Sequence, residues 1–82
     1  MTIEENKMRR CSCPYYAEEV LAYLLSNGIP FVHRKAACHG RFLLFFIIDD
    51  ETKEEIEATT RWQLSSEDGF GNDEVWSAIE KP

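Results

Sequence analysis

The clearest hydrophobic pattern in the chain is a stripe of apolar residues at three- and four-residue intervals. This spacing places the stripe on one side of an amphipathic helix. Pro14 stands where helices favour proline, because its missing N–H has no partner in the first turn, and Gly28 supplies a left-handed stop. The pattern predicts a first helix over residues 15–27, capped by Ser12 or Cys13. The stripe consists of Ala17, Val20, Leu21, Leu24 and Leu25.

The segment after this helix predicts a β-hairpin. Residues 31–36 have the composition of a strand, and residues 41–49 contain the longest apolar run of the chain. Between them, Cys38, His39 and Gly40 indicate a turn, in which Gly40 is free to take a positive φ. A turn this short predicts antiparallel pairing of the two strands.

The second strand of the hairpin is apolar on both faces, because its hydrophobic residues do not alternate with polar ones. A strand of this kind must be covered on both faces. One helix layer covers one face, so the other requires a second helix layer, a packed N-terminal segment or a partner chain. The two sets are Phe42, Leu44, Phe46 and Ile48 on one face, and Leu43, Phe45 and Ile47 on the other.

Two further helices are predicted in the second half of the chain. Carboxylates at positions 49–51 suit the positive end of a helix dipole, and Thr52 with Glu55 fits a capping box. Asn72 is placed to cap a short terminal helix. The inner face of the earlier helix comprises Ile56, Thr59, Thr60 and Gln63, with Trp62 or Leu64 at its end, and the terminal helix carries Val75, Trp76 and Ile79.

Together these elements predict an α+β fold, with an N-terminal helix, an antiparallel β-hairpin and one or two C-terminal helices packed on the sheet. The 82 residues suit a single small domain, in which residues 1–10 form a flexible tail or an edge strand. No apolar run approaches the roughly 18 residues of a membrane span. The first residues lack the pattern of a secretory signal. We therefore expect a cytoplasmic protein without a membrane partner.

The net charge of −6 is unevenly distributed along the chain. Residues 1–41 carry six basic and four acidic side chains, whereas residues 42–82 carry three basic and eleven acidic ones. Attraction to a phosphate backbone requires clustered Lys and Arg, so direct nucleic-acid binding is not predicted. The simplest interpretation of the acidic half is a solvated face that keeps a small protein soluble.

Three cysteines in a chain without an export signal favour reduced thiols. Cys11, Cys13, Cys38 and His39, together with His33, offer enough soft ligands for tetrahedral zinc. The Cys-x-Cys spacing, however, is shorter than that of structural zinc sites, and adjacent side chains of a strand point apart. Ordinary thiols at a helix start and in a turn are the simpler interpretation, so no metal and no cofactor is predicted.

No set of residues predicts catalysis. At a helix N-terminus Cys13 would have a dipole that activates a thiolate, but no motif connects it to a histidine base. Glu51-x-Lys53 resembles the acid-x-Lys element of metal-dependent nucleases, yet residues 41–43 hold no acid where those enzymes place one. The sequence therefore predicts a protein that is not an enzyme.

Aromatic and basic residues form two candidate surfaces for partner binding. Tyr15 and Tyr16, with Tyr23, are typical interface anchors, and partial burial against the sheet is the simpler alternative. Arg34 and Arg41 give the hairpin a basic rim, which suits a docking surface or, less simply, aromatic stacking on RNA. The rim also contains Phe31, His33 and Lys35, and core positions for Phe31 and Phe42 are favoured over stacking.

Acidic residues around the second helix form a third candidate surface. If its carboxylates are exposed, such a face can imitate the phosphates of a nucleic acid. The simpler interpretation is that acidic residues are favoured at the N-terminus of a helix. The candidate partner-binding residues of this face are Asp49, Glu51, Glu54, Glu55 and Glu57, continued by Glu67 and Asp68.

The order of helix 15–27, Gly28, hairpin 31–49 and the tail 73–81 is similar to that of a family of small bacterial and phage helix–hairpin–helix domains without a known function. The similarity spans most of residues 15–81. Because that family has no assigned activity, the resemblance implies a fold and no catalytic residue.

The leading functional prediction is a small binding or regulatory protein that acts through a protein–protein surface, as a homodimer or bound to another protein. Its basis is the two-sided apolar strand in a chain with little other surface to cover it. The alternative is an acidic, nucleic-acid-mimicking inhibitor of a nucleic-acid-handling protein, such as a phage anti-defence factor. A zinc-stabilised domain is the second alternative.

Overall fold

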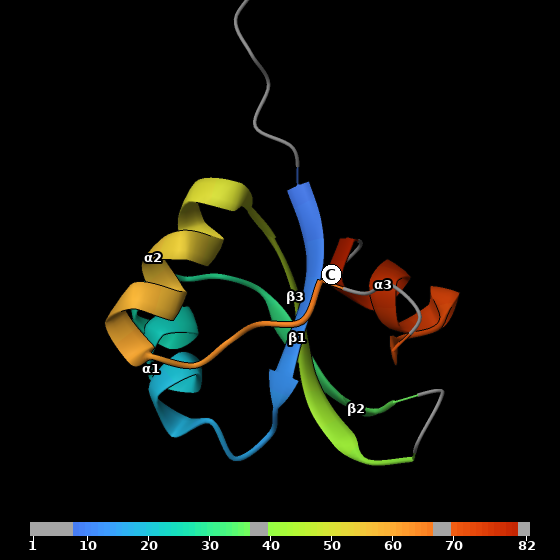
Figure 1. The fold of residues 1–82 in the computed structure, drawn as a ribbon. Coiled ribbons are helices and arrows are strands. Elements are labelled where there is room, and N and C mark those ends of the chain that lie inside the picture. Colours follow the sequence, from blue (N-terminus) through green and yellow to red (C-terminus); the bar gives the residue numbers. More distant parts are fainter. Residues whose placement is uncertain (1–7, 37–39, 67–69, 81–82) are drawn as a thin grey trace, which may run out of the picture.

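A computed structural model of the protein describes residues 8–36, 40–66 and 70–80. Its fold is α+β, as predicted, with one three-stranded antiparallel sheet and helices on both faces (Figure 1). In these three ranges, no helix is long and apolar enough to cross a membrane. The elements are β1 (Met8–Pro14), α1 (Glu18–Ser26), β2 (Phe31–Lys35), β3 (Phe42–Asp49), α2 (Asp50–Thr60) and α3 (Asp73–Glu80).

Strand β3 is the centre of the sheet, because the strand order is β1-β3-β2. It pairs with β1 from Met8 opposite Asp49 to Pro14 opposite Leu43, and with β2 along its first half. Helices α1 and α2 lie on one face of the sheet and α3 lies on the other (Figure 1). The protein therefore has three layers, with the sheet between two helical layers.

Each face of β3 packs into its own hydrophobic core, and the predicted division of its residues is confirmed. Phe46 is fully buried against α1 and α2, and Phe45 is fully buried against α3. A second helix layer thus covers the second face. The reason for predicting a homodimer, an apolar face left for another chain, no longer applies. The first core includes Leu44, Ile48, Val20, Leu24 and Ile56, and the second includes Val75, Trp76 and Ile79.

Strand β1 is the main difference from the predicted fold. Residues 11–13 are buried strand residues and do not cap a helix. Helix α1 begins at Glu18, its cap residue Ala17 offers no side-chain bond, and Pro14 is the last residue of the strand. Pro14 is tolerated there because its position directs the missing N–H away from β3. The small Cys11 and Cys13 side chains fit between the sheet and the two helices.

The start of α2 also differs from the predicted capping box. Asp49 is the cap, and its carboxylate accepts a hydrogen bond of 2.8 Å from the backbone N–H of Thr52. Thr52 is therefore the third helical residue and not the cap. On the inner side of the helix Ile56 is buried, whereas Thr59 and Gln63 are exposed, contrary to prediction. The turn residues Cys38 and His39, and Glu67 with Asp68, lie outside the described residues.

Helix α3 forms as predicted and closes the second core. The side chain of Asn72 accepts a hydrogen bond of 3.0 Å from the N–H of Val75, which caps the helix. The Trp76 ring meets Phe45 edge to face at 5.3 Å, and its Nε1–H donates to the Gly71 carbonyl at 3.2 Å. A Cβ on Gly71 would lie 3.1 Å from this ring, so glycine allows the close approach.

We expect Trp76→Ala to destabilise the protein by about 3–5 kcal/mol, because it leaves a cavity over Phe45. Trp76→Phe keeps most of the packing and removes the bond to Gly71, so its cost should be nearer 1 kcal/mol. Urea unfolding followed by the fluorescence of Trp62 measures both values. An alanine variant as stable as the wild type would contradict the assignment of α3 to the core.

Candidate functional site

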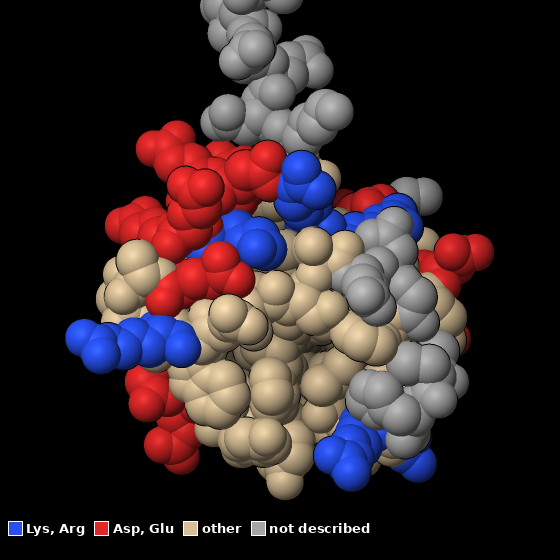
Figure 2. All heavy atoms as spheres, in the orientation of Figure 1, with Lys and Arg blue, Asp and Glu red and all other residues tan. Residues whose placement is uncertain are grey.

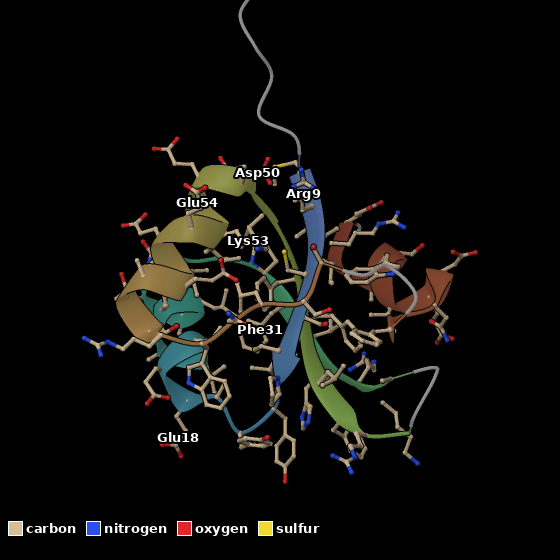
Figure 3. The ribbon with its side chains drawn as sticks, in the orientation of Figure 1. Arg9, Glu18, Phe31, Asp50, Lys53 and Glu54 are labelled. Carbon is tan, nitrogen blue, oxygen red and sulfur yellow. The ribbon has the colours of Figure 1, made fainter. Side chains whose placement is uncertain are left out.

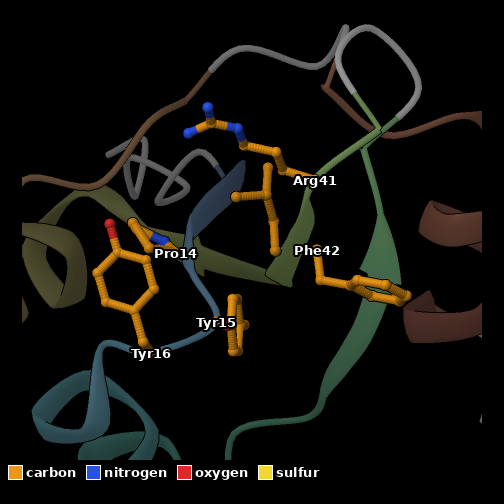
Figure 4. A pocket seen from close by; sticks show the side chains of 6 residues that line it. Pro14, Tyr15, Tyr16, Arg41 and Phe42 are labelled. Carbon is orange, nitrogen blue, oxygen red and sulfur yellow. The ribbon is translucent and has the colours of Figure 1, made fainter.

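A cleft opens where β1 leaves the sheet. The last pair of β1 is Pro14 opposite Leu43, and the chain then turns, with the Ala17 N–H donating to the Pro14 carbonyl at 3.0 Å. This turn directs Tyr15 and Tyr16 outside the sheet, beside the first residues of β3. The cleft between them has a volume of about 680 Å³ (Figure 4), which is in the range of ligand-binding cavities. Its lining comprises Pro14, Tyr15, Tyr16, Arg41, Phe42 and Leu43.

Five rings in contact form a continuous row on the α1/α2 side of the sheet, which we call the aromatic strip. Tyr15 is its centre: it stacks on His33 at 5.7 Å and meets Tyr16 edge to face at 5.5 Å. His33 in turn contacts Phe42 at 5.1 Å, and Tyr16 contacts Trp62 at 5.8 Å. The strip joins rings from the β1–α1 turn, both hairpin strands and the segment after α2.

Three of the large rings of the strip are exposed, two near its centre and one at its end. Tyr15, Tyr16 and Phe42 have relative exposures of 55%, 61% and 47%. The predicted core position of Phe42 is therefore wrong, whereas Phe31 is partly buried against the first core as predicted. Helices α1 and α2 pack on Leu44, Phe46 and Ile48 of β3, and Phe42 on the same face stays exposed. Contiguous exposed rings on a small protein are typical of interaction sites.

Cations border one end of the strip. Arg41 lines the cleft (Figure 4), and the Nζ of Lys35 lies 5.8 Å from the centre of the Phe42 ring. Arg34 is exposed on the other face of β2, where its Nη1 donates to the His33 carbonyl at 3.0 Å. Two of the predicted partner-binding groups, the tyrosine pair and Arg41, thus meet in one cleft, while Arg34 lies outside it.

The predicted acidic face contains two kinds of carboxylate, those bonded within the protein and those exposed to solvent. Asp49 caps α2, and Glu57 accepts from the Leu64 N–H at 2.9 Å and from Lys53 at 3.3 Å; both are partly buried. Glu51, Glu54 and Glu55 are exposed, and acidic side chains gather over α2 in Figure 2. Because Lys53 turns to Glu57, it does not join Glu51 as in a nuclease element.

The N-terminal end of α2 has a second, smaller and polar pocket of about 340 Å³. Arg9 of β1 forms an ion pair with Asp50 there, which raises the pKa of the Arg9 guanidinium (Figure 3). Lys53 and Glu54 complete the lining together with Ser66. Opposite charges compensate each other in this pocket, so it offers a ligand little net field.

The two described cysteines lie in the first core. Burial raises the pKa of Cys11 to about 11, and burial with the neighbouring Cys11 raises that of Cys13 to about 12. Both are therefore neutral thiols at physiological pH, in a strand and without the dipole of a helix N-terminus. Among residues 8–36, 40–66 and 70–80, no group of three or more His, Cys, Asp or Glu could hold a metal ion.

Two pKa shifts occur beside the strip. Glu19 accepts from its own backbone N–H and from Trp62 Nε1, the latter at 3.0 Å, and these bonds lower the pKa of its carboxyl. Burial and a hydrogen bond to Glu55 raise the pKa of Tyr23, which packs against the first core and takes no part in the strip. Glu19 therefore fixes Trp62, and Tyr23 is a packing residue.

Comparisons with known proteins give no relative: no protein-family model, no curated protein and no solved structure matches this chain. The resemblance to small bacterial and phage domains therefore stays a prediction, and the geometry alone supports the functional assignment.

We expect Cys11 and Cys13 to resist a thiol reagent at pH 8 in the folded protein and to react within the time of unfolding. A Cys38→Ser variant with a chromogenic disulfide reagent measures this, with and without urea. Rapid reaction of either thiol under native conditions would contradict their burial.

The same thiols give stability a dependence on alkaline pH. Their folded pKa values, about 11 and 12, exceed the ordinary value of 9.0, so their contribution is complete below about pH 9 and is lost as the pH rises towards 11–12. Urea unfolding between pH 8 and pH 11 should show falling stability, and a Cys11→Ala/Cys13→Ala variant should show a smaller fall. Equal slopes for the two proteins would contradict this assignment.

Proposed function

We propose that this protein is a small cytoplasmic binding protein, not an enzyme, that holds a partner protein through the aromatic strip and its cleft. The observation that carries the proposal is a cleft whose lining includes the exposed residues Tyr15, Tyr16 and Phe42. Tyrosine is prominent among the residues that supply most of the binding energy of interfaces, because its ring buries a large area at low entropic cost.

The surroundings of the cleft favour a partner with one apolar anchor and nearby carboxylates. The rings of Tyr15, Tyr16 and Phe42 offer an apolar side chain a place to be buried. Arg41 and Lys35 lie beside the rings and would attract acidic residues at the rim of the interface. The His33 ring, held between Tyr15 and Phe42, keeps two of these rings in place without the partner.

Site-specific photocrosslinking tests the proposal. A photoreactive phenylalanine at Tyr16 or Phe42, introduced in cells that make the protein, should crosslink to one partner, whereas the same residue at Leu25 should not. Leu25 is a suitable control because it is 64% exposed, on α1 and away from the strip.

With the purified partner, Tyr15→Ala and Phe42→Ala should each weaken binding by roughly 10- to 100-fold, the effect of removing an interface anchor. Because both side chains are exposed, the unfolding temperature of the two variants should differ little from that of the wild type. Leu25→Ala should change neither the affinity for the partner nor the unfolding temperature. Calorimetric titration measures the affinity. Unchanged affinity in both strip variants would overturn the proposal.

A second candidate function is that of an acidic inhibitor, of the phage anti-defence type, that imitates nucleic acid. The observation that favours it is the exposure of Glu51, Glu54 and Glu55 on successive turns of α2. Carboxylates spaced in this way resemble a row of phosphates to a basic cleft. Asp49 and Glu57, which are bonded within the protein, would contribute less.

Salt dependence separates the two functions. Binding through the carboxylates should weaken steeply with salt and be lost in a Glu51→Lys/Glu54→Lys variant, since it depends on charge alone. Binding through the strip should survive both changes. Affinity of the crosslinked partner in about 50 mM and about 500 mM salt, for the wild type and this variant, decides between them.

A further inference from the structure

The outer edge of β2 presents backbone groups in a regular order, and no strand of the described residues pairs with them. The N–H of Ala36 donates to the Arg41 carbonyl at 2.7 Å, in the same register that places Phe31 opposite Phe46. Because hydrogen-bonded and non-hydrogen-bonded pairs alternate in an antiparallel ladder, Val32 and Arg34 also bond to β3. The backbone N–H and carbonyl groups of Phe31, His33 and Lys35 therefore point away from the sheet.

The same alternation holds on the other side of the sheet, where the edge is occupied. Ser12 of β1 points outward, and it exchanges two hydrogen bonds with Ser65, of 2.8 and 2.9 Å. Within residues 8–36, 40–66 and 70–80, no strand pairs with the outer edge of β2. Of its outward groups, the His33 carbonyl accepts a hydrogen bond from the Arg34 side chain, which an incoming N–H can replace.

We propose that β2 pairs with β2 of a second copy of this chain, antiparallel and about a two-fold axis at His33. This register brings the outward residues together: His33 faces His33 of the second copy, and Phe31 faces Lys35 of the second copy in both directions. Each of these pairs can exchange two hydrogen bonds. A two-fold axis between antiparallel edge strands makes one continuous six-stranded sheet.

Charge favours this antiparallel register over a parallel pairing of the same two edges. In the two-fold register Lys35 lies opposite an aromatic ring and Arg34 lies opposite Val32, so no like charges of the strands face each other. A parallel, in-register contact would instead place Lys35 against Lys35 and Arg34 against Arg34, which is destabilising. Because Ser65 occupies the β1 edge at Ser12, the assembly ends at two copies.

The pairing would enlarge the aromatic strip. His33 lies on the α1/α2 side of the sheet, since it pairs with Leu44 of the first core. A two-fold axis perpendicular to the sheet keeps both strips on one side, and the two His33 rings become neighbours. The inference goes beyond the proposed function and does not depend on it, because the assembly forms without any other partner.

A charge exchange at position 33 tests the register. His33 is exposed, so His33→Lys and His33→Glu should both fold. Each variant alone places like charges opposite each other and should be monomeric. A mixture of the two should form a heterodimer, because the proposed register brings position 33 against itself. Sedimentation equilibrium from about 5 µM to about 1 mM covers the weak affinities expected of a short interface.

Matched controls use Gln63, which is exposed beyond the end of α2. Gln63→Lys and Gln63→Glu change the net charge in the same direction as the His33 variants and should dimerise like the wild type. Circular dichroism confirms that all four variants are folded.

Hydrogen exchange gives a second readout. The amides of Phe31, His33 and Lys35 should exchange rapidly in dilute protein and become protected at concentrations where the mass doubles, whereas those of Val32 and Arg34 should be protected throughout. His33→Pro removes an outward N–H without removing a bond to β3, and should reduce dimerisation.

A wild-type monomer at 1 mM would overturn the proposal, as would a dimer that both His33 variants leave intact. A monomer whose β2 amides become protected only when the crosslinked partner is added would also overturn it, and would assign the edge to that protein. These outcomes leave the test of the cleft unaffected, because that test measures partner affinity and this one measures mass.

Discussion

The burial of adjacent residues on opposite faces of β3 determines the architecture. Phe45 and Phe46 are both fully buried, one against α3 and the other against α1 and α2, and each such side chain contributes about 1.5–3 kcal/mol when removed from water. A strand with this requirement needs helices above and below it. In a chain of 82 residues the helices are short, and the first helix layer covers Leu44, Phe46 and Ile48 of β3 but leaves Phe42 exposed. The aromatic strip lies where the first helix layer ends, so the exposure of Tyr15 and Phe42 follows from the same constraint that forms the cores.

The elements that could be predicted from the sequence are those with a local cause. The division of β3 into two faces follows from strand alternation, and the terminal helix follows from Asn72 and the spacing of its apolar residues. Strand β1 could not be predicted in the same way. Cys11 and Cys13 do alternate with polar residues, but the pattern is short, and Pro14 is acceptable both at the start of a helix and at the end of an edge strand. Pairing with β3, which lies about thirty residues away in the sequence, decides between these two structures.

The candidate site shows the same limit. From the sequence, Tyr15, Tyr16 and Arg41 could be selected as residues of types that often bind partners. That they share a cleft with Phe42 could not be predicted, because their proximity depends on where β1 separates from β3. Phe42 itself belongs to an apolar run whose other members are largely buried, so its residue type indicated the core. Some of the acidic residues are bonded within the protein and others are exposed, and the sequence indicates this difference only in part. Asp49 is the helix cap, and Glu57 is bonded to Lys53 and a backbone N–H. The sequence predicts the sign of the charge on a surface, whereas the bonding partners of each carboxylate determine how much of that charge is available to another molecule.

A sheet of three strands has two edges close to its centre, and in this protein the two edges differ in what lies against them. The β1 edge is interrupted at Ser12 by Ser65, while β2 carries cations along an edge whose outward groups have no strand partner in the described ranges. Charged residues on this edge oppose a parallel pairing with the same edge of another copy, since identical side chains then meet. They do not oppose an antiparallel pairing in which Lys35 meets Phe31. The two pairings differ in this way because the two cations lie at the C-terminal end of β2 and not at its middle. The same two residues that oppose a parallel pairing are therefore compatible with the proposed two-fold pairing, which has His33 at the axis and the aromatic strip beside it.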